Sequence, residues 1–327
     1  MSYLQRKIAF YLVAVVAALG LNFFIPRLIP GNPVDAILAK TQNQAPVPPS
    51  ARHALELQFG VSNEPLWRQF AGYLSNLAHG NWGLSVTYYP TPVTEVIKQA
   101  LPWTLVLVGA ATTLSFLLGT AAGAVAGWKR GSWIDNVIPA TTFTATIPYF
   151  WLALLFLYGL AQVLPVFPLN GGYDPALVPG WSGSFLSSAV YHSVLPALTI
   201  VVASFGGWLL GMRNMMVSTV AEEFVLTAEA KGMRPRSIMI GYAARNAMLP
   251  SVAGFAISLG FVVSGSVITE TVFSYPGIGN NLVQAVQNDD YPLMQGIFLV
   301  ITLSVLGTNF LVDVLYAFID PRTRQRS

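Results

Sequence analysis

The chain has 327 residues, of which 54% are hydrophobic and only 9% are charged, and its mean hydropathy is +0.57. Soluble domains carry about a quarter of their residues as charged side chains, so a chain this poor in charge is predicted to be an integral membrane protein. The absence of cysteine excludes disulfides, thiolate metal sites and a cysteine nucleophile, and a net charge of +3 without a dense basic tract gives no reason to expect nucleic acid as a partner.

Six stretches of low charge are long enough to cross the hydrocarbon core of a bilayer, which needs about 20 residues. They lie at 8–25, between Lys98 and Lys129, and at 136–164, 192–212, 249–269 and 291–312. The first has no convincing A-x-A cleavage site, so it is expected to be a retained span and not a signal peptide. These stretches predict an all-α polytopic membrane protein with six transmembrane helices.

The basic residues of the loops predict which side each loop occupies, because cytoplasmic loops are enriched in Lys and Arg. With both termini inside, the cytoplasmic basic residues are Arg6, Lys7, Lys129, Arg130, Arg213, Lys231, Arg234, Arg236, Arg245, Arg322, Arg324 and Arg326. The external ones are Arg27, Lys40, Arg52, Arg68 and Lys98. Twelve against five places both termini in the cytoplasm. The longest external segment, 30–98, is then a candidate for a small folded cap.

Glycines recur at four-residue spacing in two of the predicted spans. Gly119, Gly123 and Gly127 form one row in the second span, and Gly207 and Gly211 form another in the fourth. Small residues at this spacing allow helix backbones to approach closely. Both rows therefore predict tight helix packing, and neither indicates a substrate.

Ionisable residues are nearly absent from the predicted spans, where they usually mark ion or proton paths. Glu270 lies at the outer end of the fifth span and Asp313 near the inner end of the sixth, so both are expected to be interfacial carboxylates. This pattern counts against an ion-coupled carrier. The sequence also lacks the H-E-x-x-H, G-x-S-x-G and P-loop motifs. Its three histidines, His53, His79 and His192, are far apart in the sequence, so catalysis is not expected.

The segment 223–250 is a polar, charged run between two apolar stretches, on the predicted cytoplasmic side. A short helix is predicted from Glu222 to Lys231, with Phe224 and Ala228 on one face. Gly232 is a suitable helix terminator because glycine readily adopts positive φ.

A second short helix is predicted to begin beside Pro235, which suits a first helical turn. It would extend to about Met248, with Ile238, Tyr242 and Arg245 along one side. A helix–break–helix element of this kind either lies on the membrane surface or docks into a groove of another protein.

Several motifs in order resemble the permease subunits of ABC importers, in the form used by the dipeptide/oligopeptide branch. The cytoplasmic segment resembles the EAA loop of that family through TAEAKG (227–232) and RNAMLP (245–250), with Leu-Thr-Ala (226–228) where sugar-type permeases have E-A-A. Similar runs are LIPGNPVD (28–35), GNWGLS (80–85), LPWTL (101–105), ETVFSYPGIGNNLVQAV with DDYPLMQG (270–296), and LVDVLYAFIDPRTR (311–324). The resemblance covers nearly the whole chain.

The resemblance implies a type I ABC importer permease fold in the inner membrane. The permease domain would occupy 95–318, with the EAA loop at 217–248. Residues 1–94 would provide a first transmembrane helix and an extracytoplasmic segment, and 319–327 a cytoplasmic tail.

The resemblance also implies a role for the EAA loop: its first helix would be a coupling helix that sits in a cleft of a cytoplasmic ATPase. The residues that match are Ala228, Glu229, Ala230 and Gly232, with Arg234 and Arg236 as electrostatic contacts. None would be catalytic, and this chain would bind no cofactor, because ATP and Mg would be held by one or two partner ATPase subunits.

The remaining implied partners are membrane lipid, a second homologous permease that completes the translocation path, and an extracytoplasmic substrate-binding protein. Asp289 and Asp290, in an outer loop, are candidate contacts for that binding protein, unless they form only a solvated acidic turn. Di- or oligopeptides are the expected substrates, and oligosaccharides, nickel and glutathione are alternatives within the same family. An ion-coupled secondary transporter and a structural membrane subunit without a transport path are the alternatives outside it.

Overall fold

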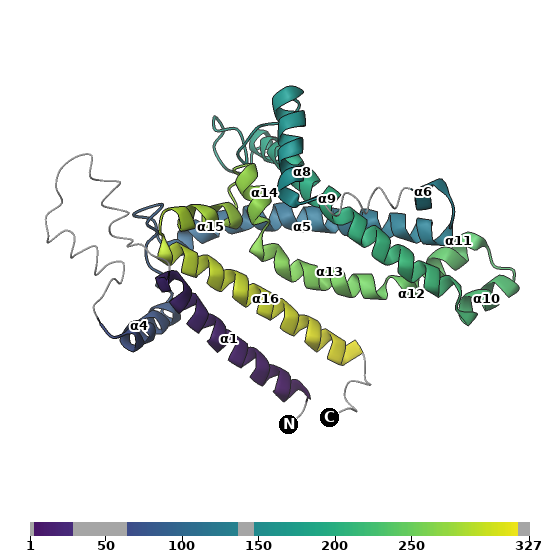
Figure 1. Ribbon diagram of the computed structural model, residues 1–327, viewed down its shortest axis with the longest axis horizontal. Coiled ribbons are helices and arrows are strands. Elements are labelled where there is room, and N and C mark those ends of the chain that lie inside the picture. The colour runs from purple at the N-terminus through teal and green to yellow at the C-terminus, as the bar shows by residue number, and fades with distance from the viewer. Residues whose placement is uncertain (1–2, 29–63, 137–146, 320–327) are drawn as a thin grey trace. The chain divides into compact units, whose positions relative to one another are not determined.

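The computed structural model of the chain describes residues 3–28, 64–136 and 147–319. Across these ranges the chain is mostly helical, with no β-strand and a single isolated bridge between Leu84 and Pro92 (Figure 1). The predicted all-α class is therefore confirmed. Among the described helices, four are long and apolar enough to cross a membrane, and a bent helix pair makes a fifth if it is counted as one span.

The chain divides into two compact units, and each is described by itself. The first comprises Met1–Thr104, Val263–Val267 and Pro276–Ser327, and the second comprises Leu105–Val262 and Ile268–Tyr275. The long helix α5 (Val93–Trp128) begins in the first unit and continues into the second.

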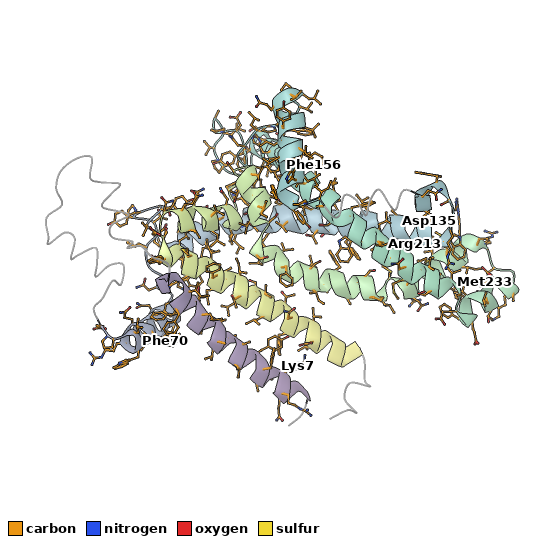
Figure 2. All side chains as sticks on the ribbon, in the orientation of Figure 1. Lys7, Phe70, Asp135, Phe156, Arg213 and Met233 are labelled. Carbon is orange, nitrogen blue, oxygen red and sulfur yellow. The ribbon has the colours of Figure 1, made fainter. Side chains whose placement is uncertain are left out.

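In the first unit, the helices α1 (Tyr3–Leu28) and α16 (Tyr291–Ile319) pack side by side (Figure 1). Asp313 joins them, because its carboxylate accepts hydrogen bonds from Lys7 Nζ at 2.7 Å and from the Tyr11 hydroxyl at 2.8 Å (Figure 2). The unit also contains α4 (Leu66–Ala78) and α15 (Ile278–Gln287). A buried apolar cluster joins the start of α5 to α15 and the start of α16.

The second unit is built on α9 (Gly183–Val220), which is longer at both ends than the predicted fourth span. The short helix α6 (Trp133–Asn136) follows α5. Helix α8 (Tyr149–Phe156) continues into a π-helical segment η1 (Leu157–Val163) and packs on α9. The first part of the predicted third span, 137–146, lies outside the described residues.

The predicted fifth span is not one continuous helix. Helix α13 (Leu249–Phe261) is followed by a 3₁₀ turn η3 (Val262–Ser264), and a separate helix α14 covers Val267–Val272. Gly265, between them, has a φ of 69°, which an α-helix does not contain. The single helix predicted over 249–269 was therefore wrong in its outer half.

The predicted close packing at the glycine row of α5 is confirmed. A Cβ atom built on Gly119 would lie 2.6 Å from Trp208 Cβ, and one on Gly123 would lie 2.4 Å from the Leu209 carbonyl oxygen. One on Gly127 would lie 2.6 Å from Met216 Cβ. These distances are too short for any side chain larger than hydrogen, so α5 and α9 approach closely along this row.

Candidate functional site

The predicted helix–break–helix element forms immediately after α9. Its first helix is α10 (Glu223–Ala230), one residue shorter at each end than predicted. Gly232 has a φ of 69°, its N–H donates to the Glu229 carbonyl at 2.9 Å, and the Met233 N–H donates to the Ala228 carbonyl at 3.3 Å. These two bonds and the positive φ define a Schellman C-cap. The prediction that Gly232 ends this helix is confirmed.

The second half of the element begins at Pro235, in the first turn of α11 (Pro235–Ser237) as predicted. It continues through a π-helical segment η2 (Ile238–Ala244) and α12 (Arg245–Ala247), and bends by 50° into α13. The π-helical turn changes which residues share a face, because its hydrogen bonds join residues five apart and not four.

The prediction that Ile238, Tyr242 and Arg245 share one side of this second half was therefore wrong. Ile238 is buried, and the next buried residues are Ala243 and Ala247. Tyr242 is 38% exposed and Arg245 is also exposed. An uninterrupted α-helical period would have placed both on the side of Ile238.

A buried cluster of apolar side chains attaches the element to the end of α9. We call it the methionine cluster, and its members are Met212, Met216, Val225, Ala228, Ile238, Ala243 and Ala247, with Met233 among the partly buried residues around it (Figure 2). Met212 and Met216 come from α9, and Val225 and Ala228 come from α10. The short helix is therefore packed at the end of α9 through Val225 and Ala228. Phe224, which the sequence predicted to share a face with Ala228, is 40% exposed.

The six predicted coupling residues divide into two groups. Ala228 is only 3% exposed and packs inward, so its small side chain serves contact with α9 and is not available to a partner. Glu229, Ala230, Gly232, Arg234 and Arg236 are all exposed. The surface that remains open is therefore the end of α10 and the turn that follows it, with apolar Leu226 beside them at 52% exposed.

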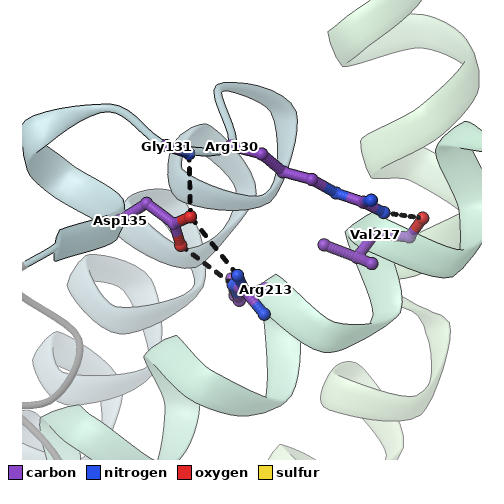
Figure 3. A network of polar contacts seen from close by, with 5 residues as sticks. All are labelled: Arg130, Gly131, Asp135, Arg213 and Val217. Carbon is purple, nitrogen blue, oxygen red and sulfur yellow. Dashed lines mark hydrogen bonds and ion pairs between the residues drawn. The ribbon is translucent and has the colours of Figure 1, made fainter.

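A polar network joins the segment 130–135, which follows α5 and includes α6, to the C-terminal part of α9 (Figure 3). The Arg213 guanidinium donates to both carboxylate oxygens of Asp135, at 3.0 Å and 3.3 Å, and the Gly131 N–H donates to Asp135 at 3.0 Å. Arg130 donates to the Val217 carbonyl at 2.8 Å, in the last turn of α9. The Arg213 hydrogen bonds lower the pKa of Asp135, which stays ionised.

This network was not predicted, although Arg130 and Arg213 were assigned to the cytoplasmic side. The two members of the ion pair are 78 residues apart, and neither belongs to a recognisable local motif. The sequence contains one indication of this pair: Asp135 and Arg213 both lie outside the predicted spans, on the predicted cytoplasmic side.

The candidate outer-loop contacts also separate. Asp290 is fully buried, and its carboxylate accepts hydrogen bonds from the Ser85 hydroxyl, from the Thr87 N–H at 2.8 Å and from the Leu293 N–H at 3.1 Å. It therefore fixes the 85–87 segment to the first turn of α16 and presents no surface to a partner. Asp289 is partly exposed and has a φ of 52°.

Comparison with known proteins identifies what this architecture belongs to. A family described as "Binding-protein-dependent transport system inner membrane component" matches residues 119–325. The chain belongs to this family. The matched range contains α9, the helix–break–helix element and α16, so the described site lies within the family's shared domain.

Individual relatives match over the full length. A di/tripeptide transport system permease protein of Pseudomonas aeruginosa is 33% identical over 100% of this chain and 99% of its own length. A probable D,D-dipeptide transport system permease protein of Escherichia coli is 33% identical over 97% and 96%. An oligopeptide transport system permease protein of Bacillus subtilis is 28% identical over 98% of both chains. The resemblance found in the sequence is therefore confirmed.

Family membership settles the class of protein. The chain is an inner-membrane component of a transport system that works with a binding protein, and it is a transport subunit and not an enzyme. Its long apolar helices agree with that location.

Proposed function

We propose that this chain is the permease subunit of an ATP-driven importer and forms half of the translocation path for di- or oligopeptides. The full-length similarity to permease proteins of dipeptide and oligopeptide systems supports the substrate class. Solute selection would rest mainly with an extracytoplasmic binding protein, and the second half of the path would come from a homologous permease.

The proposed topology has six spans with both termini in the cytoplasm. The four long apolar helices supply four of them, and α13, with its bend, supplies the fifth. The third would include the apolar helix Tyr149–Val163. The loop charges support this orientation. The permease domain would cover 95–318, after an N-terminal region at 1–94 and before a tail at 319–327.

The observation that carries the proposal is the division of α10 into two faces. Val225 and Ala228 are buried against α9, while Glu229, Ala230 and the following turn are exposed. A helix that packs on a long apolar helix with one face and is exposed on the other can bind a partner and transmit the partner's movement to the long helix. The open face would occupy a cleft of an ATPase subunit, with Arg234 and Arg236 near its rim.

The nucleotide chemistry would take place on the partner. The sequence has no P-loop motif, so ATP and Mg would be bound by one or two ATPase subunits, and this chain would bind neither. Movement of α10 would reach α9 through Met212 and Met216 and reach α5 through the close contacts at Gly123 and Gly127.

At the outer side, the binding protein would rest on the loops at 165–192 and 272–293. In the second of these loops, Asp289 keeps part of its surface exposed and Asp290 does not. The buried carboxylate of Asp290 would stabilise this loop through its hydrogen bonds to Ser85, Thr87 and Leu293.

A substitution at Gly232 tests the coupling role. Valine at a φ of 69° costs about 1–2 kcal/mol, so G232V should disrupt the C-cap and the orientation of the exposed turn. ATP-dependent peptide uptake by the reconstituted complex should be lost while the protein still inserts. G241V is the matched control, because Gly241 is exposed and its φ is not positive. Within the described part of the chain, a Cβ built there would meet no heavy atom within 4 Å beyond the local helix backbone. Normal uptake by a normally expressed G232V protein would contradict the proposal.

Co-purification tests the composition of the complex. The chain would be tagged at its C-terminus, extracted from native membranes in mild detergent and analysed by mass spectrometry. Recovery of an ATPase, a second permease and a binding protein loaded with peptide is expected. Recovery of the chain alone, under conditions that preserve another ABC complex, would contradict the proposed assembly.

A further inference from the structure

Helix α4 (Leu66–Ala78) is amphipathic, and the transport role does not account for it. At 3.6 residues per turn its apolar and polar residues form separate arcs. The apolar arc contains Leu66, Trp67, Phe70, Ala71, Tyr73, Leu74, Leu77 and Ala78, and the polar arc contains Arg68, Gln69, Gly72, Ser75 and Asn76. None of its residues is buried.

One edge of the apolar arc packs on the end of α1, within the same unit. The ring of Phe70 lies 5.1 Å from that of Phe23 and is stacked at 6.2 Å on that of Phe24 (Figure 2). Asn22 Nδ2 donates to the Tyr73 hydroxyl at 3.1 Å. Aromatic and polar contacts together therefore fix α4 against three consecutive residues of α1.

These contacts place α4 beside one end of the apolar stretch of α1. That stretch is long enough to cross a membrane and runs from Gln5 to Ile25, so the residues that hold α4 are among its last four. Phe24 and Ile25 are 45% and 47% exposed beside the contact. The exposed apolar surface of α1 thus continues directly onto α4.

The other edge of the apolar arc is not packed on α1. Trp67 is 66% exposed, and Ala71 and Ala78, one and three turns further along, are exposed as well. The Arg68 guanidinium lies 5.1 Å from the centroid of the Trp67 ring. Tryptophan and arginine side chains are suited to the headgroup level, where an apolar body meets water.

We propose that α4 lies in the outer-leaflet interface of the membrane, with Trp67, Ala71 and Ala78 in contact with lipid and Arg68, Ser75 and Asn76 toward water. An amphipathic helix in this position buries its apolar face at the boundary between headgroups and acyl chains. It would fix the depth and tilt of α1 at the point where the chain leaves the membrane.

The absence of native cysteine permits a direct test. Single cysteines at Ala71 and Asn76 would carry a nitroxide spin label in the full-length protein, within its complex, in nanodiscs of phosphatidylethanolamine and phosphatidylglycerol. Both positions are exposed, and they lie about 140° apart around the helix. Collision rates would be measured with oxygen, which concentrates in lipid, and with a neutral nickel chelate, which stays in water.

The A71C label should collide several-fold more with oxygen than with the nickel chelate, and the N76C label should show the reverse. Equal access of the nickel chelate to both labels would show that α4 faces water and would overturn the proposal. Exclusion of both reagents from A71C would show that protein covers this edge, which would also overturn it. Neither outcome depends on ATP or on the transported solute, so the proposed function is tested separately.

Discussion

Two rows of glycines with the same spacing have different surroundings in this molecule. In α5, each of Gly119, Gly123 and Gly127 would place a Cβ atom within 2.6 Å of α9. In α9, Gly207 and Gly211 are exposed, and a Cβ built on either would meet no heavy atom within 4 Å among the described residues outside the local backbone of α9 itself. The spacing indicates where helices are able to approach, and the opposing helix decides whether they do.

The largest expected effect separates the two rows. G123L would force a side chain toward the Leu209 carbonyl, which is backbone and cannot rotate away. Overpacking of this kind costs about 1–3 kcal/mol or more, so the melting temperature of the detergent-solubilised protein should fall clearly. G207L should leave it unchanged in the isolated chain. Equal melting temperatures for the two variants would break the comparison.

G123L and G207L also test whether the exposed glycines of α9 contact another subunit in the assembled complex. If G207L leaves the isolated chain intact but prevents recovery of the second permease, Gly207 is part of a contact between subunits. If both stability and recovery are unchanged, this row faces lipid. Size-exclusion chromatography of the purified complex distinguishes the two results.

A smaller and more specific effect is expected within the α5 row. A Cβ on Gly127 would meet Met216 Cβ at 2.6 Å and the Arg213 carbonyl at 2.8 Å, and Met216 is a member of the methionine cluster. G127A should therefore lower the amount of peptide imported per ATP hydrolysed. G119A, whose Cβ would meet Trp208 Cβ at 2.6 Å, should affect stability but not this ratio. If G127A and G119A import the same amount of peptide per ATP hydrolysed, movement is not transmitted through the contact at Gly127.

Local signals in the sequence predicted much of the helix–break–helix element that follows α9. Gly232 and Pro235 have strong positional preferences, and both occupy the expected cap and first-turn positions. The face of the second helix was not predictable, because the π-helical turn at 238–244 adds a residue to one turn without a recognisable composition.

Tertiary contacts account for the other differences. The burial of Asp290 depends on Ser85 and Thr87, which are more than 200 residues away. The pairing of Asp135 with Arg213 depends on how the end of α9 meets the preceding loop. The sequence places such residues on a side of the membrane but does not say which of them meet.

The smallest effect concerns the ion pair between Arg213 of α9 and Asp135 of α6. Because the folded-state pKa of Asp135 is lowered, its ionised form contributes stability above the ordinary carboxyl pKa of about 3.9, and this is lost as the pH falls through the lowered value. D135N should therefore lower the melting temperature modestly and equally between pH 6 and 8. The difference from the wild type should close only in strong acid, and closure near neutral pH would contradict this assignment.

The central claim is that α10 has one face for α9 and another for an ATPase. With no native cysteine in the chain, a photo-crosslinker attached at A230C, on the exposed end of α10, can be compared with one at A228C, which is 3% exposed. After illumination of the intact complex, the account predicts an ATPase adduct from position 230 and an adduct within the chain from position 228. An ATPase adduct from 228 alone, or none from 230 in a complex that retains its ATPase, would contradict it.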